Sequence, residues 1–176
     1  MKANVKITLS GVCAALATAF MLLSYFPYLT YAIPALAGLF IMVPLIETDM
    51  KYAVYAYFAS AVLTFIFAEP ESKMLYICLF GFYPIVKALI ERIGKATFEW
   101  VIKLLLFNLC AVTDYYISVY VLGVGFDDLG FIGKYGIYVF LALCNIVFVL
   151  YDIAVSRVAM WYMTRLHIKI KNIISR

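Results

Sequence analysis

Residues 10–20 read SGVCAALATAF and lie inside an apolar run that extends from residue 7 to residue 27. A helix needs about 20 apolar residues to cross a bilayer, so this run is long enough for one span. Gly11, Ala15 and Ala19 recur every four residues, and on a helix they form one shallow strip that a second helix can approach closely. Leucine would suit a lipid-facing position better. The strip therefore predicts a partner helix, either in this chain or in another protein.

The composition is typical of an integral membrane protein. Of the 176 residues, 67% are hydrophobic and only 14% are charged, and the mean hydropathy is +1.02. A soluble domain of this length needs many more polar residues to cover its surface. The four cysteines lie within apolar segments without a CxxC pair, so we interpret them as small buried hydrophobes and expect neither a disulfide nor a metal site.

Six apolar segments predict an all-α integral membrane protein, a single domain formed by a bundle of six transmembrane helices. Alternation of apolar and polar residues, which is the pattern of membrane barrels, is absent. The first segment is too long for a signal peptide, so we interpret it as an uncleaved span. The second contains Pro34 and Pro44, which predict a kink. The predicted spans are residues 7–27, 31–46, 52–68, 74–93, 101–124 and 135–163.

The basic residues predict the orientation of the chain. With the N-terminus in the cytoplasm, twelve basic residues fall on the inner side, and only Lys73 and Lys134 remain outside. This positive-inside bias predicts that both termini are cytoplasmic and that the bilayer of the cell membrane surrounds the helices. The basic residues form no surface interleaved with aromatic residues, so we expect no nucleic-acid partner. The outer stretch at residues 123–136, GVGFDDLGFIGKYG, predicts a loop that either covers a site or simply connects two spans.

Polar residues at membrane depth are costly and need a reason. Several of them lie at mid-depth or toward the outer side of the last three predicted spans. Convergent aromatic and hydrogen-bonding groups are typical of a small-molecule pocket, so we expect a substrate-binding site that opens outward. Hydrogen bonding between helices, without a ligand, is the alternative interpretation. The predicted binding residues are Tyr76, Tyr83, Asp114, Tyr115, Ser118, Tyr138 and Asn145.

Two charged residues lie nearer the inner side. Lys87 and Asp152 fall in the inner halves of the fourth and sixth predicted spans, and we predict that they form a structural ion pair, which lowers the cost of burying either charge. On the fourth span, Lys87 follows Tyr76 and Tyr83 at helical spacing, so we expect these three side chains to share one face.

The sequence contains no motif that carries catalysis. HExxH, GxSxG and nucleotide-binding loops are absent, and the one histidine, His167, lies in the basic C-terminal tail. No cluster of carboxylates and histidines suits a metal ion. We therefore expect a protein that is not an enzyme, has no catalytic residues and needs no cofactor. If it pumps a solute, the energy comes from a partner or from an ion gradient.

The stretch KITLSGVCAALATAF, residues 6–20, resembles the first helix of the substrate-binding (S) components of energy-coupling factor transporters. Those proteins have six helices, cytoplasmic termini and small residues at four-residue spacing in the first helix. The resemblance implies that Gly11, Ala15 and Ala19 dock on a transmembrane coupling protein, which is driven by two ATPase subunits. It also implies that a vitamin, a vitamin precursor or a metal ion binds in the outer half of the bundle, and that the S component topples in the membrane to release it.

Three functions are consistent with these patterns. The first is the membrane-embedded substrate-binding subunit of a micronutrient importer that takes up a vitamin or vitamin precursor. The second is a non-transporting scaffold or assembly protein, which would use the strip for a partner and bind no solute. The third is a small ion-coupled transporter or channel, in which Asp114 and Lys87 would be the functional charges. No similarity between the two halves of the chain supports this third function.

Overall fold

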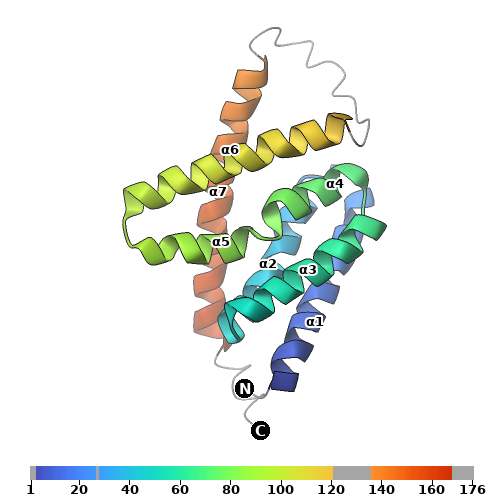
Figure 1. Cartoon of the computed structure of the whole chain (residues 1–176), viewed down its shortest axis with the longest axis vertical. Coiled ribbons are helices and arrows are strands. Elements are labelled where there is room, and N and C mark those ends of the chain that lie inside the picture. The colour runs from blue at the N-terminus through green and yellow to red at the C-terminus, as the bar shows by residue number, and fades with distance from the viewer. Residues whose placement is uncertain (1–2, 27, 121–135, 168–176) are drawn as a thin grey trace.

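The computed structural model describes residues 3–26, 28–120 and 136–167, and every regular element in these ranges is helical (Figure 1). Short 3₁₀ turns (η1, η3) and one π-helical stretch (η2) interrupt or extend the α-helices. The elements are α1 (Ala3–Met21), η1 (Leu22–Tyr25), α2 (Ala32–Glu47), α3 (Met50–Phe67), α4 (Pro70–Leu75), η2 (Tyr76–Phe80), α5 (Tyr83–Ile90), η3 (Glu91–Ile93), α6 (Ala96–Tyr120) and α7 (Gly136–Arg165).

Several helical segments are long and apolar enough to cross a membrane, which indicates a multi-pass membrane protein. Five segments in the described ranges meet this criterion: Ala3–Tyr25, Met50–Phe67, Pro70–Ile93, Ala96–Asp114 and Leu141–Arg165. The apolar helix α2 is shorter, with 16 residues. Each predicted span corresponds to one of these helices or to a series of them, with shifted ends. Residues 121–124 and 135 of the last two predicted spans lie outside the described residues.

The first three helices pack closely and form the main core. Their contact surfaces consist largely of alanine, and Ala17, Ala37 and Ala53 are fully buried. Small side chains allow helix backbones to approach closely, and close packing is what holds helices together in lipid. Figure 1 shows α1, α2 and α3 side by side at one side of the molecule.

The fourth predicted span is not one continuous helix. The N–H of Gly81 donates to the carbonyl of Tyr76 at 2.7 Å, a bond over five residues that makes η2 a π-helical turn. Such a turn contains one additional residue, and one residue corresponds to about 100° of rotation around a helix. Tyr76 consequently joins the core of α1–α3, whereas Tyr83 packs beside Phe148 of α7. The expectation that Tyr76 and Tyr83 share a face is therefore wrong.

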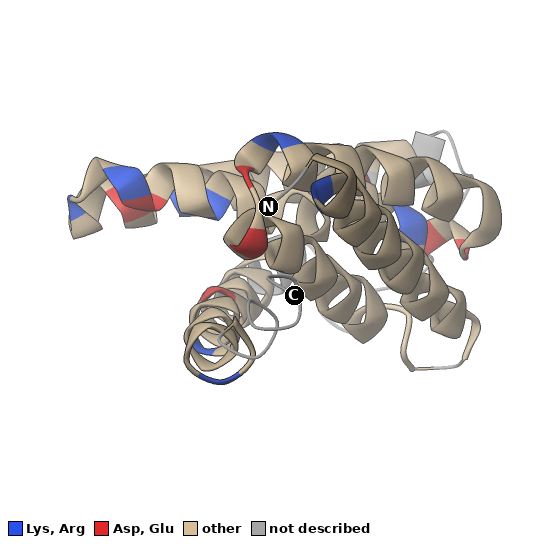
Figure 2. Cartoon of the chain, turned by 90° about the horizontal axis from the view of Figure 1, so that it is seen from below, with Lys and Arg blue, Asp and Glu red and all other residues tan. Residues whose placement is uncertain are grey.

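The helices α6 and α7 lie against this body with much of their surface exposed. Phe107 of α6 stacks on Phe148 of α7, with ring centroids 4.4 Å apart, and Tyr83 packs against the same cluster. The connection from α5 through η3 to α6 extends away from the other helices, and Figures 1 and 2 show it as a projecting arm. Large apolar side chains on these exposed faces suit contact with lipid.

Candidate functional site

Polar contacts gather at two opposite ends of the bundle. At one end, Lys6 Nζ lies 2.5 Å from Asp49 Oδ2, and the carboxylate of Glu47 accepts a hydrogen bond from Tyr162 Oη at 2.9 Å. These contacts join the start of α1, the link between α2 and α3, and the end of α7. We call this the basic end, because Lys6 of α1 and Arg165 in the last turn of α7 lie there.

The opposite end carries carboxylates, and we call it the acidic end. Tyr31 Oη donates to Glu71 Oε2 at 3.3 Å, and Ser72 Oγ donates to Glu69 Oε2 at 2.7 Å. The carboxylates of Glu71, Glu69 and Asp114 all lie within electrostatic range of the Tyr31 hydroxyl. Among the described residues, none of these three carboxylates takes part in an ion pair. Three carboxylates thus lie near one another at this end, and Lys73 of α4 is the basic residue that α4 contributes beside them.

Asp114 is the most unusual polar group at the acidic end. Its Oδ1 atom is buried, and no hydrogen-bond partner for it exists in the part of the chain that the structure describes. The carboxylate of Glu71 lies within electrostatic range and adds repulsion. An unpaired carboxylate oxygen in apolar surroundings is costly unless it is protonated or meets a ligand. Of the predicted binding residues, Asp114 therefore has the geometry that best suits a ligand.

The structure does not bring the predicted binding residues together. Tyr76 Oη lies 2.7 Å from Ser60 Oγ and is buried in the main core. Asn145 of α7 and Asn108 of α6 exchange amide hydrogen bonds of 2.9 and 3.1 Å. Tyr76 and Asn145 thus make the interhelical or core hydrogen bonds of the alternative interpretation. The side chains of Tyr115, Ser118 and Tyr138 lie outside the described residues.

Tyr83, the remaining predicted binding residue, belongs to a charge cluster of α5, α6 and α7. Its hydroxyl donates to Asp152 Oδ1 at 2.5 Å. Lys87 Nζ is in direct contact with the same carboxylate, which is the pairing predicted from the depth of the two residues. Lys103 Nζ lies 3.3 Å from Asp152, and all three side chains are almost fully buried. Hydrogen bonds to three donors compensate for the desolvation of the carboxylate.

Glu91 completes a ring of four charges, which consists of Lys87, Glu91, Lys103 and Asp152. Its Oε1 lies 2.8 Å from Lys87 Nζ and 2.9 Å from Lys103 Nζ, so each lysine contacts both carboxylates. The Glu91 side chain is 43% exposed, in contrast to 5–6% for the other three. Sequence reasoning missed Glu91 and Lys103 as members of this ring. The spacing of four residues between Lys87 and Glu91 was a usable signal, because such pairs meet on a helix.

The small-residue strip of α1 faces outward. Gly11, Ala15 and Ala19 are exposed, and a Cβ atom added at Gly11 would meet nothing within 4 Å. By contrast, Ala14 and Ala17 are buried against the neighbouring helices. Within the described ranges, no helix of this chain covers the strip.

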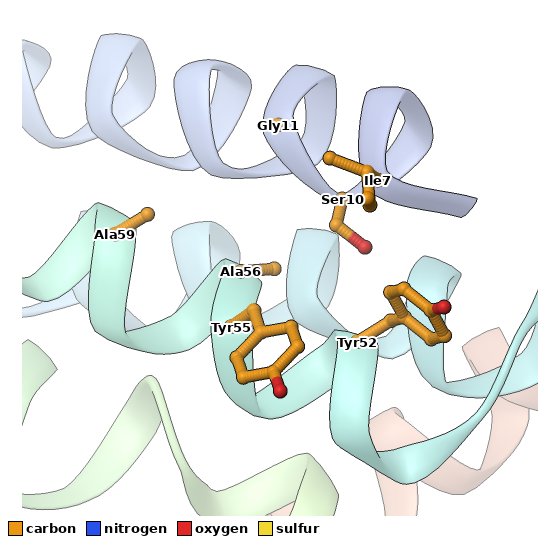
Figure 3. Close-up of a pocket in the computed structure, with 7 residues that line it drawn as sticks. All are labelled: Ile7, Ser10, Gly11, Tyr52, Tyr55, Ala56 and Ala59. Carbon is orange, nitrogen blue, oxygen red and sulfur yellow. The ribbon is translucent and has the colours of Figure 1, made fainter. Parts of the chain in front are cut away.

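A shallow apolar groove adjoins the strip at its Gly11 end. It lies between α1 and α3, has a volume of about 190 Å³, and is open on one side (Figure 3). Figure 3 shows the two tyrosine rings of α3 on one wall and the α1 side chains on the other. The residues that line the groove are Ile7, Ser10, Gly11, Tyr52, Tyr55, Ala56 and Ala59.

Comparisons with protein-family models, with curated proteins and with solved structures found no match for this chain. Within the described residues, no three His, Cys, Asp or Glu side chains are grouped so that they would hold a metal ion. The features that bear on function are therefore the acidic end, the ring of four charges and the exposed strip of α1.

Proposed function

We propose that this chain is the membrane-embedded substrate-binding subunit of a micronutrient importer, of the kind represented by the S components of energy-coupling factor transporters. It spans the cell membrane six times with both termini in the cytoplasm. It captures a vitamin or vitamin precursor from the outer side and depends on a separate coupling protein with two ATPase subunits. In this orientation the acidic end faces outward and the basic end faces the cytoplasm.

The exposed strip of α1 is the observation that carries this proposal. Small residues on a transmembrane helix are favourable where another helix packs on them, and the described helices leave Gly11, Ala15 and Ala19 uncovered. A partner in another protein accounts for a strip that is small, apolar and unoccupied. The coupling protein is that partner in our proposal.

The acidic end supports the solute-binding part of the proposal. Asp114 Oδ1 is buried without a hydrogen-bond partner among the described residues, and Tyr31 and Glu71 lie near it. Polar groups that converge at one end of a helical bundle are suited to orienting a small molecule.

The first experiment is native mass spectrometry of the detergent-purified protein. A stoichiometric small-molecule adduct would support a substrate-binding subunit and would identify the class of its solute. An adduct that Asp114→Asn weakens would connect that solute to the acidic end. If no adduct is found and no vitamin stabilises the protein against unfolding, the scaffold function becomes the better explanation.

A matched pair of substitutions on α1 tests the strip. We expect Ala15→Trp to abolish uptake of the identified solute by cells that carry the coupling module, while the purified variant still binds it. Leu16→Trp is the control, because Leu16 is also exposed on α1 but lies beside the strip. Equal loss of uptake in both variants would contradict docking through the strip. The ion-coupled transporter would be favoured if Asp114→Asn reduced uptake more than Ala15→Trp and if the purified wild-type protein bound protons or ions.

A further inference from the structure

The connection between α5 and α6 has the composition of a lipid-binding surface. We call residues 89–101 the elbow. Leu89, Ile93, Phe98 and Val101 expose between 45% and 60% of their surface there. The elbow projects from the bundle in both views, and Figure 2 shows basic residues along it. Because the rest of the chain does not cover it, the elbow is accessible to lipids at the membrane surface.

Positive charge predominates around the elbow. Residues 87–103 contain four basic and two acidic residues. Arg92 and Lys95 are exposed, and neither takes part in an ion pair within the described residues. Lys95 Nζ lies 5.8 Å from the ring centroid of Phe98. Cations beside exposed apolar and aromatic side chains are typical of protein surfaces at the lipid headgroups, and clusters of such cations recognise anionic lipids.

The ring of four charges adds a more specific feature. Both lysine ammonium groups form an ion pair with one oxygen, Oε1 of Glu91, at 2.8 and 2.9 Å. On the buried side, Asp152 balances one of these two positive charges. Without Glu91, Lys87 and Lys103 would form a cradle with one uncompensated positive charge. A single anionic oxygen, such as that of a phosphodiester, has the charge and geometry to replace Oε1.

Glu91 is placed so that it can leave this cradle. It is the exposed member of the ring, and it is the first residue of η3, the turn that directly follows α5, with its backbone N–H bonded to the carbonyl of Lys87. Gly94, which follows η3, has a φ angle of +72°, a conformation that favours glycine and ends the turn. A rotation of the exposed Glu91 side chain would uncover both lysines without unwinding α5.

We propose that the elbow binds the phosphate group of an anionic phospholipid, and that Glu91 is the internal carboxylate which this phosphate displaces from Lys87 and Lys103. Arg92 and Lys95 hold the headgroup at the entrance, and the exposed apolar side chains contact the acyl chains. As a tethered group, Glu91 competes with the lipid at an effective concentration in about the millimolar range, so binding depends on lipid abundance. This site needs a membrane but no transport activity, so it stands apart from the proposed import function.

The test is native mass spectrometry of the full chain with equal amounts of phosphatidylglycerol and phosphatidylcholine. We expect the wild-type protein to retain phosphatidylglycerol preferentially. Glu91→Gln should raise the ratio of bound phosphatidylglycerol to phosphatidylcholine at least about fivefold, because the competing carboxylate is lost. Glu91→Asp keeps the net charge but withdraws the carboxylate from the lysines, and it should raise the ratio in the same direction. Glu99→Gln, which removes a negative charge outside the ring, should change the ratio less than about twofold.

Further variants keep the test decisive if Glu91→Gln does not fold. Arg92→Gln combined with Lys95→Gln should remove the preference for phosphatidylglycerol, whereas Lys51→Gln, at an exposed lysine at the start of α3, should leave it unchanged. Equal effects of Glu91→Gln and Glu99→Gln together with no effect of Glu91→Asp would overturn the proposal in favour of unspecific attraction. Displacement of the lipid by an equal concentration of inorganic phosphate would overturn the assignment to a lipid.

Discussion

Gly38 is the position at which α2 touches the backbone of the π-helical turn. A Cβ atom added there would lie 2.2 Å from the carbonyl oxygen of Phe80 and 2.9 Å from its carbonyl carbon, with Tyr151 Oη at 3.2 Å. A side chain can rotate away from an added methyl group, but these two nearest atoms belong to the backbone. We therefore predict that Gly38→Ala forces α2 and η2 apart and destabilises the fold.

The size of the effect follows from the distances. A carbon and an oxygen atom that are not bonded need more than 3 Å, so the backbones must separate by about 1 Å. Overpacking of a core typically costs about 1–3 kcal/mol, and the rigid neighbour places this site in the upper part of that range. The better helix propensity of alanine returns at most about 1 kcal/mol. We expect a net loss of roughly 1–2 kcal/mol in the free energy of unfolding.

Reversible unfolding in mixed micelles, followed by circular dichroism while the fraction of denaturing detergent is raised, measures this difference. Gly11→Ala is the matched control, because it makes the same chemical change in α1 where nothing lies within 4 Å of the added atom. It should be neutral or should stabilise the protein by less than about 1 kcal/mol. The reasoning would be refuted if Gly38→Ala were as stable as the wild type, or if Gly11→Ala lost as much stability.

Two further predictions concern polar contacts between helices. Lys87→Met and Asp152→Leu should each cost about 3–5 kcal/mol of stability, because each leaves an uncompensated charge at a buried site. The double variant should lose less than the sum of the two single losses, and strictly additive losses would contradict the pairing. For the amide pair, a double-mutant cycle with Asn108→Leu and Asn145→Leu should give a coupling energy of about 0.6 kcal/mol and at most about 1.7 kcal/mol. The same unfolding assay measures it, and strictly additive effects would show that the pair adds no stability.

Apolar runs and charge positions were sufficient to predict the helical class and the approximate place of each helix. They also predicted that Lys87 and Asp152 meet, because two opposite charges at the same depth have few other partners in an apolar medium. Helical spacing in α1 predicted a strip of small residues but did not predict which face of the helix is covered. The structure shows that Gly11 is exposed, whereas Ala14 and Ala17 are buried.

The predicted pocket depended on helical phase, and the phase was wrong beyond Tyr76. The residues from 76 to 80 have no composition that distinguishes a π turn from an α turn, so the rotation of α5 relative to α4 was hidden. The role of Lys103 was missed for another reason. The predicted span began at residue 101, which put Lys103 at a membrane surface, whereas α6 begins at Ala96 and carries Lys103 into the buried cluster.

The ring of four charges also has a consequence for the order in which the protein is made. Three of its members belong to α5, η3 and α6, but Asp152 follows Lys103 by 49 residues. At a synthesis rate of about 5–20 residues per second, roughly 2–10 s pass before Asp152 emerges. During this interval Glu91 alone faces two lysine charges, so we expect α6 to reach its final position in the bilayer only when α7 arrives. In this order of events α7 would complete the insertion of α6, and a ribosome stalled ahead of Asp152 would leave the two lysines with Glu91 as the one carboxylate of the ring.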